Sequence, residues 1–200
     1  MIRLYCATGN AGKLREFQLH SAISIEPLPR FHQIPPCVED GATFEENAVL
    51  KARHYGRWGR PPGPPGQAER PAPLVFADDS GLEVDALGGA PGVHSARFAG
   101  PDATDEANNR LLLEKLRGIG SRAARFVCAI ALVEGGRLRG VWRGAVEGVI
   151  LDEPRGAAGF GYDPLFYCPP LGCTFGEAAA ESKFSVSHRG RALRAMLAAL

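Results

Sequence analysis

The chain has 200 residues, of which 45% are hydrophobic, and its 23 basic and 22 acidic residues give a formal net charge of +1. This length and apolar content fit one domain, or one domain with two lobes, and the balanced charge gives no global field that favours DNA, RNA or an anionic membrane as partner. The five cysteines lack any Cys-x-x-Cys spacing and the longest apolar run, Phe126–Val133, is far shorter than a membrane span, so we expect a cytoplasmic protein with reduced thiols.

The first predicted element is a strand over Ile2–Ala7, which breaks at the loop Thr8-Gly-Asn-Ala-Gly-Lys13 before a helical pattern begins at Leu14. A glycine loop between a strand and a helix presents backbone N–H groups and the helix dipole to an anion. Lys13 would add a point charge for a phosphate oxygen. The Walker A spacing is absent, and a glycine-rich turn at this position is also compatible with a purely structural role.

A second strand is expected over Ile23–Leu28, followed by an irregular proline-containing connection. Thr43-Phe-Glu-Glu46 has the form of a capping box, which predicts a helix over Phe44–Tyr55. Lys51 falls on the apolar stripe of that helix, where it either extends its ammonium group to solvent or has a functional role. Residues 56–73, rich in proline and glycine, are expected to form an exposed loop.

Four carboxylates and four glycines are concentrated between Phe76 and Arg97. The apolar run Leu74–Ala77 predicts a buried strand that ends at Asp78, and chemistry in open α/β sheets collects at strand ends. Because adjacent carboxylates repel one another, Asp78 and Asp79 suggest a divalent cation. The alternative is an Asx-type turn closed by Gly81.

The second half of the chain predicts a helix from Thr104 to Leu116, a buried strand over Arg125–Val133 and a half-exposed strand near Leu138–Val146. The last strand is a candidate sheet edge or subunit contact. A second glycine loop, residues 156–164, then leads into a strand over Pro164–Tyr167.

A short helix is expected from Thr174 to Ser182, followed by an amphipathic C-terminal helix capped by Ser187. Lys183, His188 and Arg189 would sit at or just before that N-terminus, where cations oppose the helix dipole. This pattern favours an anionic or carbonyl-rich ligand opposite them, and an ordinary basic turn is the alternative.

Five segments, taken together in this order and spacing, closely resemble the inosine triphosphate pyrophosphatase family over nearly the whole chain. The segments are Thr8-Gly-Asn-Ala-Gly-Lys13, Thr43-Phe-x-Glu-Asn47 with Lys51-Ala-Arg53, Asp78-Asp-Ser-Gly-Leu82, Gly159-Phe-Gly-Tyr-Asp-Pro164 and Ser187-His-Arg-Gly190. The resemblance implies a homodimeric, Mg²⁺-dependent hydrolase that converts ITP, dITP and XTP to the monophosphate and pyrophosphate. It also implies an α/β fold, with a long twisted mixed sheet flanked by helices and two lobes around a central nucleotide cleft. Residues 1–200 would form one domain, with residues 56–73 as an insertion loop.

Site residues carried over from the resemblance fall into three groups. Asp79 would be the catalytic base and a metal ligand, with Glu39 as a second metal ligand. The phosphates would be bound by Thr8, Gly9, Asn10, Ala11, Gly12, Lys13, Lys51 and Lys183. Ser80 would contact substrate, and the base pocket would be formed by Phe160, Gly161, Tyr162, Asp163, His188 and Arg189.

These residue types suit hydrolysis at a polyphosphate, because cleavage between the α- and β-phosphates needs charge neutralisation more than covalent help. We expect a general-base mechanism without a phosphoenzyme. A hydrogen-bond donor such as Arg189 or a loop N–H would donate to the 6-carbonyl of hypoxanthine, and the amino group of adenine would leave that donor unpaired. Two alternatives are a nucleotide-binding regulatory module without hydrolysis and a phosphotransferase, the second weakened by the absence of kinase motifs.

Overall fold

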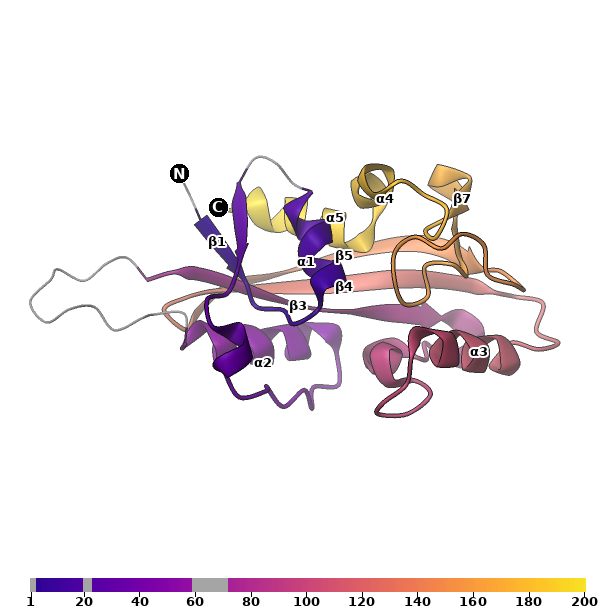
Figure 1. Ribbon diagram of the computed structural model, residues 1–200, viewed down its shortest axis with the longest axis horizontal. Helices are drawn as coiled ribbons and strands as arrows, with labels where there is room; N and C mark the ends of the chain where they lie inside the picture. The colour runs from indigo at the N-terminus through magenta and orange to yellow at the C-terminus, as the bar shows by residue number, and fades with distance from the viewer. Residues whose placement is uncertain (1–2, 20–22, 59–71) are drawn as a thin grey trace, which may run out of the picture. The chain divides into compact units, whose positions relative to one another are not determined.

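The computed structural model describes residues 3–19, 23–58 and 72–200 (Figure 1). The described residues form strands and α-helices that alternate along much of the chain. The strands are β1 (Arg3–Cys6), β2 (Ser24–Pro27), β3 (Leu74–Val84), β4 (Ala123–Glu134), β5 (Arg137–Ile150), β6 (Phe166–Cys168) and β7 (Cys173–Thr174). The α-helices are α1 (Ala11–Gln18), α2 (Phe44–Gly56), α3 (Asp105–Lys115), α4 (Ala180–Val186) and α5 (His188–Leu197).

The strands form one mixed seven-stranded sheet in the order β2-β1-β3-β4-β5-β6-β7. β1 runs parallel to β2 and to β3, and Cys6 lies opposite Phe76 in the β1–β3 register. β6 is antiparallel to both β5 and β7. The predicted mixed α/β sheet flanked by helices is therefore confirmed.

The chain divides into two compact units. The first unit holds the described residues up to Asp79 with Ala129–Trp142 and Leu193–Leu200, and the second unit holds Ser80–Cys128 with Arg143–Ala192. Residues 59–71, most of the predicted insertion loop, lie outside the described residues.

In the first unit, α1 and α2 lie on opposite sides of the strands (Figure 1). Phe17 of α1 packs edge-on against Phe76 of β3, with ring centroids 5.2 Å apart, and both side chains are fully buried. The predicted capping box of α2 is present, since Glu46 N–H donates to Thr43 Oγ1 at 3.1 Å and Ala42 N–H donates to Glu46 Oε2 at 2.7 Å. Capping of this kind fixes where the helix starts and therefore which residues face β3.

Strand β3 differs from the sequence prediction, because it continues through Asp78 and Asp79 to Val84. The two carboxylates sit within a strand and not at its end, nor in an Asx turn. A strand can carry them because lysines neutralise both, as described below. Gly81 serves close packing, since a Cβ there would collide with Ser95 Oγ and with the Gly92 carbonyl.

The core of the second unit is built from β3, β4, β5 and α3 residues together with Phe166 and Phe175. Thr104 caps α3 by accepting from Ala107 N–H at 3.2 Å, and Ser187 caps α5 by accepting from Gly190 N–H at 3.1 Å, both as predicted.

The helix predicted to begin at Thr174 is wrong, because α4 begins only at Ala180. The capping hydrogen bonds do form, since Thr174 N–H donates to Glu177 Oε2 at 2.8 Å and Glu177 N–H donates to Thr174 Oγ1 at 3.1 Å. Thr174 also belongs to β7, and its hydroxyl donates to Arg155 O at 2.8 Å. Because Thr174 pairs within the sheet, its capping hydrogen bonds close a turn after β7 and do not start a helix.

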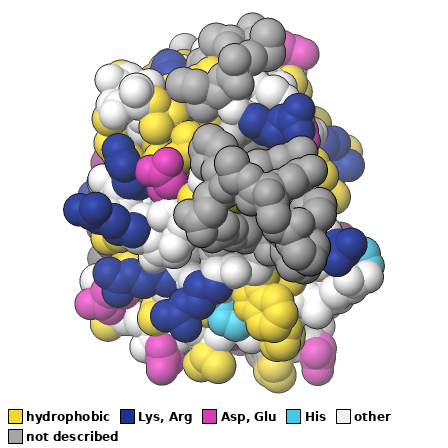
Figure 2. Space-filling view, turned by 90° about the vertical axis from the view of Figure 1, so that its left-hand side faces the viewer, with side chains coloured by type: hydrophobic (Ala, Val, Ile, Leu, Met, Phe, Trp, Pro, Cys, Tyr) yellow, Lys and Arg dark blue, Asp and Glu magenta, His cyan; other side chains and the backbone are white. Residues whose placement is uncertain are grey.

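On the face shown in Figure 2, Lys and Arg side chains are interspersed with acidic and apolar ones, in keeping with the balanced charge. Among the described residues, no helix combines the length and apolar character that a membrane crossing requires.

Candidate active site

The first polar cluster is centred on Lys51, whose ammonium group contacts two carboxylates in the first unit. Lys51 Nζ lies 2.8 Å from Asp79 Oδ1 and 2.9 Å from Glu39 Oε2. Asn47, one helical turn before Lys51 on α2, donates from Nδ2 to Asp79 Oδ2 at 3.3 Å. Residues four apart on a helix share a face, so α2 directs both side chains at the same carboxylate.

Burial and charge act in opposite directions on the Lys51–Asp79 pair. Burial alone would lower the pKa of Lys51, but Asp79, Asp78 and Glu39 together raise it above its ordinary value, so the ammonium stays charged. Burial raises the pKa of Asp79, while Lys51 and Lys13 oppose that shift. The result is an ionised pair with an aspartate that holds a proton more readily than an exposed one.

The second ion pair of this unit joins the glycine loop to β3. Lys13 Nζ lies 2.8 Å from Asp78 Oδ2, and the Asp78 side chain is 1% exposed. Asn10 caps α1 by accepting from Lys13 N–H at 3.0 Å, and Thr8 Oγ1 accepts from Asn10 N–H at 3.2 Å. These bonds order the loop so that the N-terminal turn of α1 follows directly from β1.

A divalent cation fits the donors of this cluster. Asp79 and Glu39 both contact one ammonium group, so their carboxylates already converge on a single positive charge. No group of three or more His, Cys, Asp or Glu side chains suited to a metal was found among the described residues. Two carboxylates completed by phosphate oxygens and water are the usual set for Mg²⁺.

The second polar cluster, in the second unit, is centred on Asp163. Its Oδ2 accepts from Lys183 Nζ at 2.6 Å and from Phe160 N–H at 2.8 Å. The Lys183 and Asp163 side chains are only 5% and 4% exposed. Asp163 therefore fixes both a buried cation of α4 and the backbone of the second glycine loop.

Cations cover the ring of Phe160. Arg189 Cζ lies 4.9 Å and Lys183 Nζ 5.3 Å from its centroid, distances typical of cation–π contacts. Arg189 also donates from Nη2 to Ser80 Oγ at 2.9 Å. The arrangement presents an aromatic ring, a guanidinium and a hydroxyl from separate segments of the chain.

Two predicted base-pocket residues have different surroundings. His188 is 1% exposed and stacks on Phe126, with ring centroids 4.8 Å apart. Tyr162 is 4% exposed, packs in the hydrophobic core and donates its hydroxyl to Ser95 O at 2.9 Å. Of the two aromatic residues that flank Gly161, Phe160 is the more accessible.

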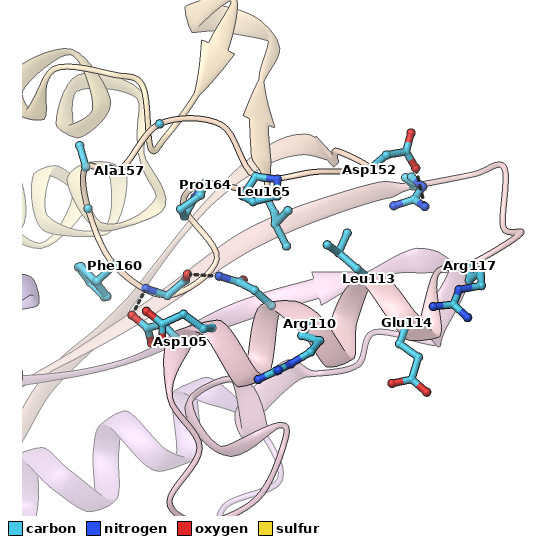
Figure 3. Close-up of a pocket in the computed structure, with 18 of the residues that line it drawn as sticks. Asp105, Arg110, Leu113, Glu114, Arg117, Asp152, Ala157, Phe160, Pro164 and Leu165 are labelled. Carbon is cyan, nitrogen blue, oxygen red and sulfur yellow. Dashed lines mark hydrogen bonds and ion pairs between the residues drawn. The ribbon is translucent and has the colours of Figure 1, made fainter.

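A groove of about 1000 Å³ lies beside this cluster in the second unit, between α3 and the 152–165 segment (Figure 3). Phe160 and Gly161 line it from one side, and Asp105 and Asn109 from the other. Both acidic and basic side chains of α3 line it, among them Asp105, Arg110 and Glu114.

Sequence reasoning missed three residues that hold these clusters together. Asn47 shares a helical face with Lys51, and the i, i+4 spacing was a signal available in the sequence. Asp105 and Asn109 contact the second glycine loop across 56 and 52 residues of chain, and no local pattern indicates such a pairing.

The chain is similar to known proteins over nearly its whole length. The sequence profile of the Ham1 family matches residues 4–199. A dITP/XTP pyrophosphatase of Acidobacterium capsulatum is 47% identical, over all of this chain and 98% of that protein. One of Syntrophobacter fumaroxidans is 50% identical over 95% of this chain and 78% of that protein. The solved structure of a HAM1 protein from Coxiella burnetii has a TM-score of 0.80 at 39% identity, covering 98% of this chain and 96% of that one.

Proposed function

Because the chain belongs to the Ham1 family, we propose that it is a nucleoside triphosphate pyrophosphatase that hydrolyses ITP, dITP and XTP. The products are the nucleoside monophosphate and pyrophosphate, and the role is removal of noncanonical purines from the nucleotide pool. The protein acts as a cytoplasmic homodimer with Mg²⁺. The observation that carries the proposal is the Lys51 ammonium held between Asp79 and Glu39 at 2.8 and 2.9 Å.

The polar cluster of the first unit binds the triphosphate. A triphosphate carries about four negative charges, and Lys13, Lys51 and the N–H groups of the Thr8–Lys13 loop supply matching positive charge. Lys13 and Lys51 already have carboxylate partners at 2.8 Å. Phosphate oxygens therefore replace or extend contacts that the side chains are positioned to make.

Asp79 and Glu39 are the residues that would hold Mg²⁺, and the cation would supply positive charge for the pyrophosphate leaving group and a bound water of lowered pKa. Asp79 also serves as the proton acceptor for the attacking water. Asn47 orients the same carboxylate through its 3.3 Å hydrogen bond.

The cluster of the second unit binds the base. Phe160 offers a ring face for stacking, and Arg189 offers a donor that a purine 6-carbonyl accepts. Lys183 keeps the phosphate-binding role that the family resemblance implies. Adenine carries an amino group there, so it leaves a donor unpaired at a cost of about 1–3 kcal/mol.

The test is turnover of purified protein with Mg²⁺ on a panel of ITP, dITP, XTP, ATP and GTP, with monophosphate and pyrophosphate measured separately. We expect monophosphate and pyrophosphate in equal amounts from the first three and much slower turnover of ATP and GTP. Orthophosphate as the first product would indicate a phosphatase or phosphotransferase instead.

A nucleotide-binding module without hydrolysis is the alternative. It is disfavoured by Asp78 and Asp79, because a protein that only binds phosphate gains nothing from buried carboxylates next to its lysines. Tight ITP binding by the wild type without any pyrophosphate release would favour it.

A further inference from the structure

The geometry points to Asp105 and Asn109 of α3 as positioning residues for the second glycine loop, and through it for selection of the purine base. This inference rests on the proposed function. Asp105 Oδ2 accepts from Gly161 N–H at 2.6 Å, and Asn109 Nδ2 donates to Gly161 O at 3.0 Å (Figure 3). The two side chains, one helical turn apart, hold both backbone hydrogen-bonding groups of a single residue.

These two hydrogen bonds act on Gly161, the residue of the loop whose backbone they can orient most. Its φ of +64° is in the left-handed region, and it joins Phe160 to Tyr162. Each neighbour is held by a hydrogen bond, since Phe160 N–H donates to Asp163 Oδ2 within the loop and the Tyr162 hydroxyl donates to Ser95 O. Asp105 and Asn109 therefore fix the backbone of Gly161, a glycine with wide conformational freedom that lies between two hydrogen-bonded aromatic residues.

The orientation of the Phe160 ring depends on the hydrogen bonds that Asp105 and Asn109 make to Gly161. The ring is contacted by Arg189 and Lys183 at 4.9 and 5.3 Å, and a rotation at Gly161 would change the face that it offers to a purine. Asp105 is a short charge-assisted acceptor at the start of α3, and its carboxylate also helps to raise the pKa of Tyr162 after the larger effect of burial. Asp105 and Asn109 touch no reacting atom in this scheme.

The test compares Asp105→Ala, Asn109→Ala and the conservative Asp105→Asn with the wild type. Glu114→Ala is the matched control, because Glu114 is an exposed acid of α3 that lines the same groove. The measured quantity is the ratio of kcat/KM for ITP to that for ATP, with urea unfolding of each variant and the amide resonance of Gly161 by NMR.

We expect both alanine variants to lower the ITP-to-ATP ratio about three- to tenfold, mainly through a higher KM for ITP. Asp105→Asn keeps an oxygen acceptor and should stay within about twofold of the wild type, as should Glu114→Ala. The Gly161 amide proton should shift upfield in Asp105→Ala.

Three results would overturn the inference: an unshifted Gly161 amide, a shifted amide with an unchanged ratio, or equal losses for ITP and ATP that merely follow stability. Failure of the proposed function is distinguishable from all three, because the wild type would then release no pyrophosphate from any triphosphate. If Asp105→Ala does not fold, Asn109→Ala carries the same comparison.

Discussion

The Lys51 ammonium lies 2.8 Å from the Asp79 carboxylate although the two side chains are only 10% and 11% exposed and 28 residues apart in sequence. Removing one member of such a pair leaves the other charge buried without compensation. Lys51→Met should therefore lower the free energy of unfolding by roughly 3–5 kcal/mol, measured by urea denaturation.

The exposed pair Arg3–Glu26, with side chains 61% and 39% exposed, is the matched control. Arg3→Met should leave stability nearly unchanged, because solvent screens an exposed pair. Equal effects of the two substitutions would mean that Lys51 is solvated and does not balance Asp79.

A substitution at Gly159 can test the hydrogen bonds of Asp163 by displacing its carboxylate. A Cβ at Gly159 would collide with Asp163 Oδ2, whereas a Cβ at Gly172 meets nothing within 4 Å. Both residues have positive φ, +78° and +67°, so both alanine variants carry similar backbone strain of about 1 kcal/mol. Only Gly159→Ala should also raise the KM for ITP, by about tenfold, because it displaces the acceptor of Lys183 and Phe160 N–H.

Titration of Tyr162 gives a prediction at high pH. Burial first, and the charge of Asp105 second, raise the pKa of its phenol above the ordinary value. At pH values between the pKa of Tyr162 in the unfolded chain and its pKa in the folded protein, the folded state binds more protons than the unfolded state. The contribution of Tyr162 to stability is therefore complete below about pH 10 and is lost as the pH rises through the pKa of the folded protein.

The melting temperature should therefore fall between about pH 10 and 11 more steeply in the wild type than in Tyr162→Phe. Tyr162→Phe should also lower the melting temperature at neutral pH, because Ser95 O loses its 2.9 Å donor. Parallel pH profiles for the two proteins would show that the phenol titrates normally.

Local patterns predicted much of the fold because they report local interactions. Thr43 and Thr104 cap α2 and α3, and the apolar runs around Leu4, Val75 and Ile130 lie in buried strands. The end of β3 was misjudged because charges usually terminate a buried strand, and the compensating Lys13 and Lys51 come from distant segments. The helix expected at Thr174 failed for a related reason, since Arg155 and β6 engage that residue.

The glycine loops and acid pairs proposed as the site were visible in the sequence, whereas side chains that only hold other groups were not. Lys51 was ambiguous in sequence between a solvent-exposed ammonium and a site residue, and its contact with Asp79 favours the second. Asp105 and Asn109 act through contacts that no periodicity encodes. Of the residues predicted for the base pocket, Tyr162 lies in the hydrophobic core, so Phe160 is the more accessible of its two aromatic rings.

The most direct test of the central claim follows ITP by ³¹P NMR with wild-type protein and with Asp79→Asn, alongside calorimetric measurement of ITP binding to both. The account predicts IMP and pyrophosphate from the wild type, and a rate at least about a hundredfold lower from Asp79→Asn with binding retained. IDP and orthophosphate as products, or an Asp79→Asn variant as fast as the wild type, would contradict it.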